Sequence, residues 1–490
     1  MRNSTESSAA QKGDGVTASD MNSYSAAARL ERLPISSFHR EIMWSLGFVF
    51  FFEVSAVSTF ANAMPVISKQ WHLTASTNSF VIGATFFGMF IGSTTAGWFS
   101  DHIGRKRALI YFAIWYAGFS LLNAFVWETV GLLVTRMLTG IGLSAIVVVG
   151  ITYISEMFPA NKRGTFQGYV MLIGLCGIPI TGYVAYLTIH ELGPWAWRLV
   201  FVWGSLGALF VMFAGRLEES PRWFATRGRT AEAEAALDRI EARVQAEKGI
   251  LSPPQKQIQP SGVAHTYRDL FAPAYLRQTI VVIVAWVAQT LGFYGFLAWV
   301  PWLLGQRGFS PDNSVLLSSI MQLGVVPGAL LAAVLSDRFE RKWLIAAVAL
   351  GVGAFGVPYG MSSHPVPIII FGFLVATGLQ MFAPLLYAYT PEAYPTDIRN
   401  SGVGLAYGLG RLANAVGPMI IAFIYTRYGY VAVFVYIALC WSAVAITIGG
   451  FGVRTRGRSL EMLSEVATPT NIMTANFTSM ETGETEQPLS

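Results

Sequence analysis

The chain alternates long apolar stretches with short polar loops. Twelve apolar stretches of roughly 20 residues can be drawn, and a helix of that length crosses the ~30 Å hydrocarbon core of a bilayer. The core of a soluble domain does not supply twelve such stretches, so the pattern predicts an all-α membrane protein. We place the twelve transmembrane helices at residues 43–66, 78–100, 107–127, 129–153, 164–189, 196–215, 277–304, 314–336, 343–361, 366–390, 401–425 and 431–452.

Two polar loops in the first half of the chain have counterparts in the second half. The loop Gly97–Arg107 matches Ser336–Lys342, in which Ser, Asp, Arg and Lys recur at corresponding positions. The loop Glu156–Arg163 matches Glu392–Arg399, and both pairs of loops share an offset of 236 residues. Two loops repeated in one register indicate a duplicated chain, which is typical of transporters. The twelve helices are therefore expected to form two pseudo-symmetric six-helix bundles.

The first of these loops carries a family resemblance. It resembles the G-x-x-x-D-R-x-G-R-K/R loop of the major facilitator superfamily, with Asp101 and Arg105 in register and His102 where members usually have Arg. Glu219–Trp223 resembles the E-S-P-R-W sequence that ends the sixth span of sugar porters. Phe293–Pro301 resembles the seventh span of the branch with niacin-type and synaptic-vesicle-protein-type members. The resemblance implies the major facilitator fold and secondary transport of a small solute by alternating access.

The chain divides into five parts: a disordered tail at 1–38, an N-terminal bundle at 39–215, a loop with a helix at 216–276, a C-terminal bundle at 277–453 and a tail at 454–490. The helix in the loop alternates charges, so we expect it to be solvated or to brace the ends of the bundles. Short loops on the side of the termini hold nine basic residues, against three in the opposite loops. The positive-inside rule therefore predicts cytoplasmic termini. We expect a prokaryotic cell (inner) membrane, and the long tails leave a eukaryotic membrane as the alternative.

Composition narrows the function classes further. Hydrophobic residues make up 53% of the chain and charged residues 12%, about half the charged share of a soluble protein. The net charge of +5 follows from the basic loops and does not indicate nucleic-acid binding. Cys176 and Cys440 lie inside apolar stretches and are read as small buried hydrophobic residues. We find no phosphate-binding loop, metal-ligand spacing or nucleophile motif, so we expect that the protein is not an enzyme and holds no cofactor or metal. We also expect a monomer.

Ionisable side chains inside a span are functional candidates, because each one is costly to place in the membrane. Glu53 is the only acid deep in a predicted span and is therefore the candidate for proton coupling, or alternatively a fixed counter-ion to an arginine. Arg136 lies about 10 Å into the fourth span and is expected to pair with Glu53. Arg411 lies about 16 Å into the eleventh span, and no acid of the second half lies at its depth. It favours an anionic substrate such as a small carboxylate, or pairing with Glu53 across the cavity.

Polar and aromatic residues complete the predicted cavity, since substrate pockets combine aromatic walls with a few polar groups. With Arg411 and Arg136, the candidates for substrate binding are Gln289, Tyr294, Trp299, Gln380, Tyr387 and Asn414. In family members the loop acid caps a helix of the opposite half. The resemblance therefore implies that Asp101 faces the start of the eleventh span and Asp337 that of the fifth. The predicted cytoplasmic gate consists of Asp101, Arg105, Glu156, Arg163, Asp337, Arg338, Arg341, Glu392 and Arg399, with Glu156 and Arg163, and Glu392 and Arg399, as possible pairs.

Three functions are compatible with this pattern. The first is proton symport of a small organic solute, with Glu53 carrying the proton and Arg411 holding a carboxylate. The second is facilitated transport or symport of a neutral sugar or polyol. The third, from another class, is a receptor or scaffold that does not transport; the intact loops in both halves argue against it. The partners implied are a small-molecule substrate, protons and the lipid bilayer.

Overall fold

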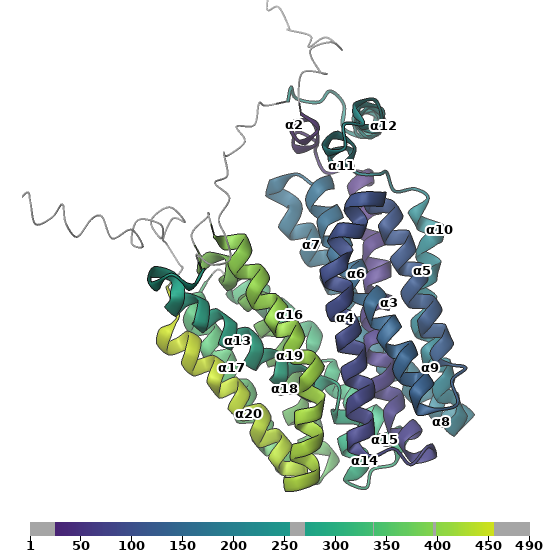
Figure 1. The fold of residues 1–490 in the computed structure, drawn as a ribbon, viewed down its shortest axis with the longest axis vertical. Helices are drawn as coiled ribbons and strands as arrows, with labels where there is room; N and C mark the ends of the chain where they lie inside the picture. The colour runs from purple at the N-terminus through teal and green to yellow at the C-terminus, as the bar shows by residue number, and fades with distance from the viewer. Residues whose placement is uncertain (1–24, 255–269, 337, 395–397, 455–490) are drawn as a thin grey trace, which may run out of the picture.

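The computed structural model describes residues 25–254, 270–336, 338–394 and 398–454. Within these ranges the chain consists of helices and connecting loops, without strands (Figure 1). Six spans form the first half. Their helices are α3 (Ser37–Gln70), α4 (Ala75–Ile103), α5 (Arg105–Asn123), α6 (Thr129–Met157), α7 (Ala160–Leu175) with α8 (Gly177–Leu192), and the series η1 (Pro194–Ala196), α9 (Trp197–Ser205), η2 (Leu206–Leu209) and α10 (Phe210–Ala214).

Six further spans form the second half. They are α13 (Pro273–Leu297) with α14 (Val300–Gln306), α15 (Pro311–Gln322) with α16 (Val325–Leu335), α17 (Arg341–Met361), α18 (Pro365–Glu392), α19 (Arg399–Tyr428), and α20 (Tyr430–Ile446), which continues as η4 (Thr447–Phe451). Eleven of the twelve spans are long and apolar enough to cross a membrane by length and composition alone. The remaining span is α5, the third in chain order, which does not meet this criterion. It begins with three basic residues, but it packs beside α6 and α9 within the first bundle (Figure 1). The prediction of twelve spans is confirmed.

The spans differ from the predicted ranges mainly at their ends. Helix α3 begins at Ser37, six residues before the predicted start, because Ser36 caps it together with the His39 ring. The fifth and sixth spans are not continuous helices, since the α-helical pattern is interrupted at Cys176 and again at η2. Helix α5 starts directly after Gly104, whose φ of +100° lies in the left-handed region that glycine tolerates.

Glycines bring α4 and α6 into backbone contact. A Cβ atom on Gly88 would lie 2.0 Å from the Met137 carbonyl oxygen, and one on Gly92 would lie 2.0 Å from the Ile141 carbonyl oxygen. Within a membrane such small residues permit the close packing that holds helices together. This contact fixes the wall of the first bundle on which Arg136 stands.

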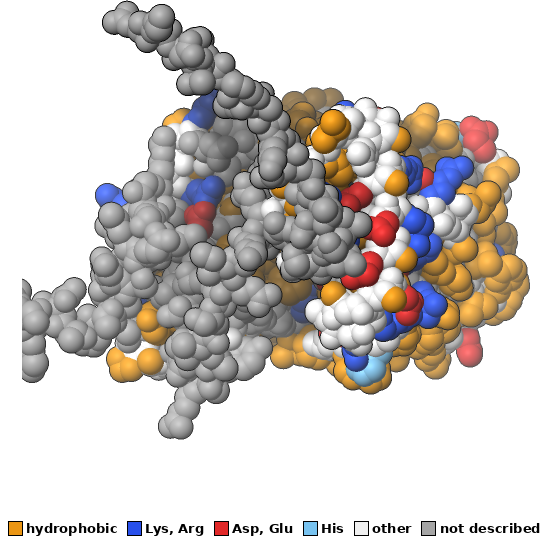
Figure 2. Space-filling model, turned by 90° about the horizontal axis from the view of Figure 1, so that it is seen from above, with side chains coloured by type: hydrophobic (Ala, Val, Ile, Leu, Met, Phe, Trp, Pro, Cys, Tyr) orange, Lys and Arg blue, Asp and Glu red, His pale blue; other side chains and the backbone are white. Residues whose placement is uncertain are grey.

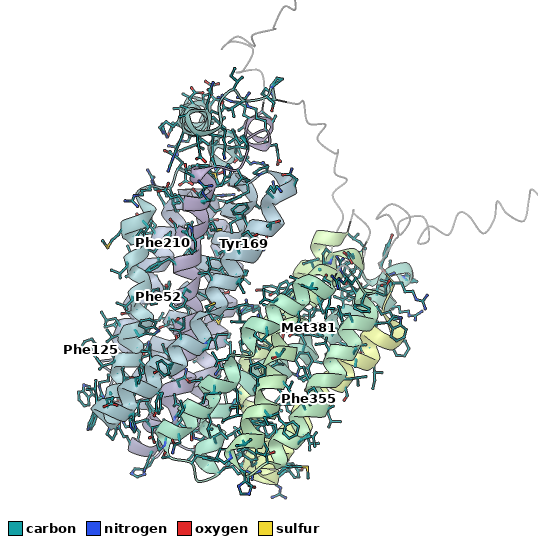
Figure 3. All side chains as sticks on the ribbon, turned by 180° about the vertical axis from the view of Figure 1, so that it is seen from behind. Phe52, Phe125, Tyr169, Phe210, Phe355 and Met381 are labelled. Carbon is teal, nitrogen blue, oxygen red and sulfur yellow. The ribbon has the colours of Figure 1, made fainter. Side chains whose placement is uncertain are left out.

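The two bundles share one apolar core, whose first-half residues lie toward the end of the molecule opposite to the Gly97–Arg107 loop and whose second-half residues run the length of that bundle. That core includes Phe60 and Phe86 of the first half together with Trp299 and Trp302 of the second half. A separate core, confined to the first half, lies toward the Gly97–Arg107 loop. The helix axes of the two bundles diverge toward the end of the molecule that carries the Gly97–Arg107 loop (Figures 1 and 3). We call the end of the molecule that carries this loop the basic-loop face.

Three short helices cover the basic-loop face of the first bundle: α2 (Ala26–Glu31), α11 (Pro221–Thr226) and α12 (Thr230–Lys248). Charged side chains of both signs gather on this part of the face (Figure 2). The prediction of a disordered tail through residue 38 is wrong for residues 25–38, because Arg29 is buried and bonds Asp238 and Glu241 of α12. Residues 1–24 lie outside the described part. Helix α12 buries Leu237, Ile240 and neighbouring residues, so it is not a freely solvated helix.

Candidate functional site

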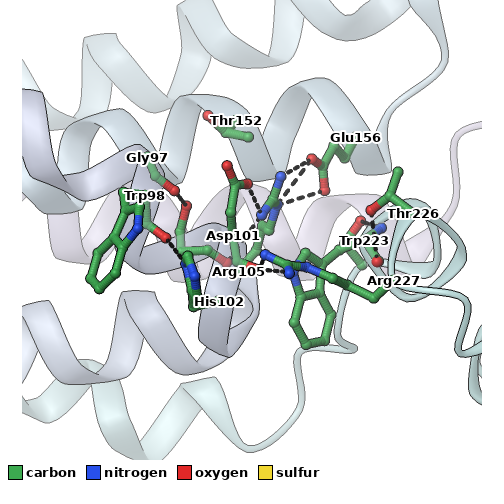
Figure 4. Close-up of polar contacts among 12 residues, drawn as sticks. Gly97, Trp98, Asp101, His102, Arg105, Thr152, Glu156, Trp223, Thr226 and Arg227 are labelled. Carbon is green, nitrogen blue, oxygen red and sulfur yellow. Dashed lines mark hydrogen bonds and ion pairs between the residues drawn. The ribbon is translucent and has the colours of Figure 1, made fainter.

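The Gly97–Arg107 loop is held by a set of ion pairs within the first half (Figure 4). Arg105 pairs with Asp101 at 2.6 Å and with Glu156 at 2.9 Å, so the guanidinium joins the end of α4 to the end of α6. Glu219 accepts hydrogen bonds from the backbone N–H groups of Arg105 (2.7 Å) and Lys106 (3.0 Å). An acid at this position stabilises the start of α5 by satisfying unpaired N–H groups at the positive end of the helix dipole.

The second half repeats part of this arrangement. Arg341 forms an ion pair with Glu392, in the same way as Arg105 pairs with Glu156 in the first half. Arg341 also donates to the Ser336 hydroxyl at 3.4 Å. The structure describes Arg338, whereas Asp337 and the side chain of Arg399 lie outside the described residues. The duplicated loops thus have a duplicated ion pair.

Two predicted gate contacts are wrong. Asp101 does not face the start of the eleventh span, because its side chain pairs with Arg105 of the first half and its carbonyl oxygen accepts from Trp223 and Arg227 of the segment between the bundles. Arg163 pairs with Glu31 at 3.1 Å and not with Glu156, whose carboxylate is already bound by Arg105. Glu392 is likewise bound by Arg341. Because the bundles diverge at this face, the described ion pairs of Arg105 and Arg341 stay within their own halves.

Glu53 and Arg411 lie on opposite sides of the interface between the bundles. Glu53 stands on α3 and is 5% exposed. Arg411 stands on α19, and its positive charge interacts electrostatically with the Glu53 carboxyl group. No ion pair joins them, and the Glu53 carboxyl forms no hydrogen bond within the described ranges. Arg411 instead donates from Nη2 to the Tyr407 hydroxyl and stacks on that ring at 4.9 Å. Its Nη1 has no hydrogen-bond partner among the described residues.

Aromatic rings surround this guanidinium. Trp286 of α13 meets Tyr387 edge-on at 4.9 Å and Tyr407 at 5.3 Å, and Tyr387 and Tyr407 lie 6.0 Å apart. Trp286 is buried and donates to Thr390, whereas Tyr387 is 52% exposed in the last two turns of α18. The cluster places an unpaired cationic donor beside flat apolar surfaces, which suits a ligand that is both anionic and aromatic.

Arg136 does not pair with Glu53, so this predicted pairing is wrong. It is 2% exposed and donates to the Thr85 hydroxyl (3.2 Å), the Ala56 carbonyl oxygen (3.2 Å) and the Thr59 hydroxyl (3.5 Å). Among the described residues it has no carboxylate partner. Neutral oxygens therefore satisfy part of its donor capacity, and its guanidinium borders the central cavity.

This central cavity lies between the bundles and has about 500 Å³ of empty space when the solvent at its open mouth is included. Its wall combines residues of α3, α4, α6, α13 and α15, and the Phe86 and Tyr294 rings meet across it at 4.6 Å. Four neutral polar side chains take part with Arg136, namely Ser58, Asn62, Thr85 and Gln322. The Oδ1 atom of Asn62 and the Oε1 atom of Gln322 are buried without a partner in the described part of the chain. The cavity thus offers unused acceptors to a ligand.

A second, smaller cavity of about 180 Å³ lies between α13 and α19. Tyr294 lines both cavities, and Trp299 and Asn414 line the smaller one. The Trp299 Nε1–H group and the Asn414 Oδ1 atom are buried and lack partners within the described residues. Because no charged side chain lines it, this cavity suits a neutral polar group.

Four of the residues predicted to bind substrate line neither cavity: Arg411 and Tyr387, which belong to the aromatic cluster described above, and Gln289 and Gln380. Gln289 donates to the Thr290 hydroxyl at 2.8 Å, and Gln380 is buried against Gly328 of α16 inside the second bundle. Sequence reasoning also missed Asn62, Gln322 and Tyr407. Tyr407 could have been found, because it lies one helical turn before Arg411 on the same face of α19.

Comparison with known proteins places the chain in a family. The sequence profile described as "Sugar (and other) transporter" matches residues 41–467. The metabolite transport protein YyaJ of Bacillus subtilis is 42% identical over 438 residues, covering 89% of this chain and 97% of YyaJ. The niacin transporter NiaP of Acinetobacter baylyi is 30% identical over 445 residues, covering 89% and 99% of the two chains.

A solved structure shows the same fold. The xylose transporter XylE from Escherichia coli, in a partially occluded inward-open conformation, superposes with a TM-score of 0.68 at 18% sequence identity. The match covers 86% of this chain and all of the XylE chain. The chain therefore belongs to the sugar (and other) transporter family of the major facilitator superfamily, and it is a multi-pass integral membrane transporter and not an enzyme.

Proposed function

We propose that the protein imports a small aromatic carboxylate by alternating access, coupled to proton symport. In this proposal Arg411 binds the carboxylate, the rings of Trp286, Tyr387 and Tyr407 enclose the aromatic body, and Glu53 carries the proton. The observation that carries the proposal is the buried Nη1 of Arg411, which has no hydrogen-bond partner among the described residues, on a side chain whose charge acts on Glu53. The relative NiaP adds support, because niacin is an aromatic carboxylate.

The proposed mechanism follows from charge balance. A buried arginine without an ionic partner is costly, so an anionic ligand that pairs with Arg411 stabilises the loaded state. Protonation of Glu53 removes its competition for the same guanidinium, and substrate and proton then bind together. Alternating exposure requires the bundles to rock about the site, with the basic-loop face cytoplasmic by the positive-inside rule. We further propose the cell membrane of a prokaryote as the location.

Binding and uptake of nicotinate by the purified protein test the carboxylate site. We expect Arg411→Gln to weaken nicotinate binding about 10- to 100-fold, because that is the loss of affinity when a hydrogen bond to a charged group is removed. Binding of nicotinamide, the neutral amide of nicotinate, should stay unchanged. Arg427→Gln, at the exposed end of the same helix, is the control and keeps wild-type affinity. Equal nicotinate affinity in the Arg411→Gln variant and the wild type would remove the anion site.

Proteoliposomes test the proton coupling. We expect Glu53→Gln to abolish accumulation driven by a pH gradient while retaining exchange of labelled for unlabelled substrate, because the site still forms but no longer carries a proton. Accumulation by this variant would contradict the role of Glu53.

A sugar or polyol is the second candidate substrate. Ser58, Asn62, Thr85 and Gln322 line the central cavity with neutral hydrogen-bonding groups, as recognition of hydroxyl groups requires. Sugar uptake that persists in Arg411→Gln would favour this candidate. The absence of uptake of either class would favour a receptor or scaffold.

A further inference from the structure

Tyr116 of α5 carries a buried phenol that has no role in the transport cycle proposed above. It is fully buried, and its hydroxyl has no hydrogen-bond partner among the described residues. Buried hydroxyl groups in proteins are normally hydrogen-bonded, because an unsatisfied one loses its interactions with water without replacement. A position of this kind inside a transporter bundle therefore points to a partner that comes and goes.

The fold makes room for this hydroxyl at one place. A Cβ atom on Gly207 would lie 1.7 Å from the Tyr116 hydroxyl oxygen and 3.0 Å from the Phe52 Cβ atom. Gly207 belongs to η2 (Leu206–Leu209), the 3₁₀ segment that interrupts the sixth span. Such interruptions within a helix often mark functional sites. The missing side chain of Gly207 thus leaves a notch in which the hydroxyl rests against α3.

The residue that follows Phe52 on α3 is Glu53. Titratable groups on three other helices interact electrostatically with Glu53, namely Arg411 from α19, Tyr294 from α13 and Tyr116 from α5. The first two belong to the opposite bundle, and Tyr116 belongs to the same bundle as Glu53. The carboxyl group therefore has polar groups on both sides, one set across the interface and one behind it.

We propose that Tyr116 is a positioning residue for Glu53, whose hydroxyl donates a hydrogen bond to the Glu53 carboxylate when that side chain turns away from Arg411. This inference rests on the proposed proton coupling through Glu53. The two orientations give the unprotonated carboxylate a partner on either side of the interface. Tyr116 thereby holds the unprotonated carboxylate inside the first bundle, away from Arg411, until proton and substrate bind together.

The test is the pH dependence of uptake by the full-length protein in proteoliposomes, with nicotinate as the probe. We expect Tyr116→Phe to shift the pH of half-maximal uptake upward by about one unit, because loss of a hydrogen bond to the charged form favours the protonated carboxyl. Nicotinate affinity stays within about twofold, since the ring and the Arg411 site are kept. A wild-type pH profile in Tyr116→Phe would overturn the proposal.

A second variant and two controls separate the possible outcomes. Gly207→Ala pushes the hydroxyl out of its notch, and we expect a shift in the same direction. Tyr153→Phe removes another buried hydroxyl of the same bundle, which donates to the Glu218 carbonyl oxygen, and keeps the wild-type profile. Accumulation by Glu53→Gln would defeat the proposed coupling itself. Loss of accumulation in Glu53→Gln together with an unchanged profile in Tyr116→Phe would defeat the role of Tyr116 alone.

Discussion

The guanidinium of Arg411 is held by one neighbour on its own helix. Tyr407, one turn earlier on α19, accepts a hydrogen bond from Nη2 and presents its ring face to the guanidinium. This leaves Nη1 as the donor directed to a ligand. A flexible arginine that is fixed in this way loses less conformational entropy when it binds an anion, and preorganisation of this kind improves affinity.

Removal of the Tyr407 hydroxyl tests this preorganisation. We expect Tyr407→Phe to weaken nicotinate binding about tenfold, because the hydrogen bond is lost while the stacking remains. Tyr425→Phe, on the same helix beside Trp302, is the matched control. Isothermal titration of both variants measures the difference. Equal affinities of the two variants would show that Tyr407 does not orient the guanidinium.

At the scale of residues, the sequence revealed which charged side chains lie inside the spans, but it did not reveal which residues they pair with. Glu53, Arg136 and Arg411 stand out because a charge within an apolar stretch is costly and therefore rare. Asn62 and Gln322 do not stand out, since neutral polar residues occur in many spans. The pairing of Arg163 with Glu31 could not be foreseen, because it depends on a six-residue helix, α2, whose position is set by tertiary contacts alone.

At the scale of elements, close helix packing depends on single glycines. Gly88→Ala places a methyl group where the Met137 carbonyl oxygen lies, so α4 and α6 must separate. We expect this variant to lose about 1–3 kcal/mol of stability, the usual cost of overpacking, and to melt at a lower temperature in detergent. Gly97→Ala, farther along α4 with open space around it, is the control and keeps or raises the melting temperature. A wild-type melting temperature in Gly88→Ala would contradict this packing.

The docking of α12 onto the start of α3 depends on pH. The Ser37 hydroxyl, the Ser37 backbone N–H and Lys248 lower the pKa of Glu247 from 4.5 to about 2. Because the folded pKa is depressed, this contribution to stability is present above about pH 5 and is lost as the pH falls toward 2. We expect amide exchange in α12 to accelerate over this range in the wild type.

In Glu247→Gln the same segment should exchange faster at pH 7 and show a smaller dependence on pH. Glu234→Gln, on the same helix, serves as the control. An acid-independent exchange rate in the wild-type α12 would show that Glu247 does not contribute to its docking.

The elements themselves were largely predictable from the sequence. A run of apolar residues must form a helix in lipid, because every backbone group needs an internal partner there. The same rule does not reveal where a span is interrupted, so the breaks at Cys176 and η2 were missed. Nor does it apply outside the membrane, where α2 and α12 depend on the ion pairs of Arg29 with Asp238 and Glu241.

At the scale of the whole molecule, the bundles meet at the end opposite to the basic-loop face. There Phe86 contacts Tyr294, and His190 of α8 lies 3.3 Å from Asp312 of α15. At the basic-loop face the charged groups of Arg105 and Arg341 pair within their own halves. In the proposed cycle this structure is one of two alternating conformations, and transport through that cycle requires the His190–Asp312 contact to break.

A covalent link across this contact should therefore stop transport. We expect a protein with His190→Cys and Asp312→Cys, in a background with Cys176→Ser and Cys440→Ser, to lose uptake when a short cleavable bifunctional thiol reagent joins the two positions. Uptake returns when the link is cleaved by reduction. The control pair is Thr74→Cys with Thr77→Cys, whose native hydroxyls lie 3.0 Å apart within the first half and move together. Full uptake by the linked His190→Cys, Asp312→Cys protein would show that the bundles do not separate at this end, because a rigid-body exchange of access cannot proceed while the two halves are joined there.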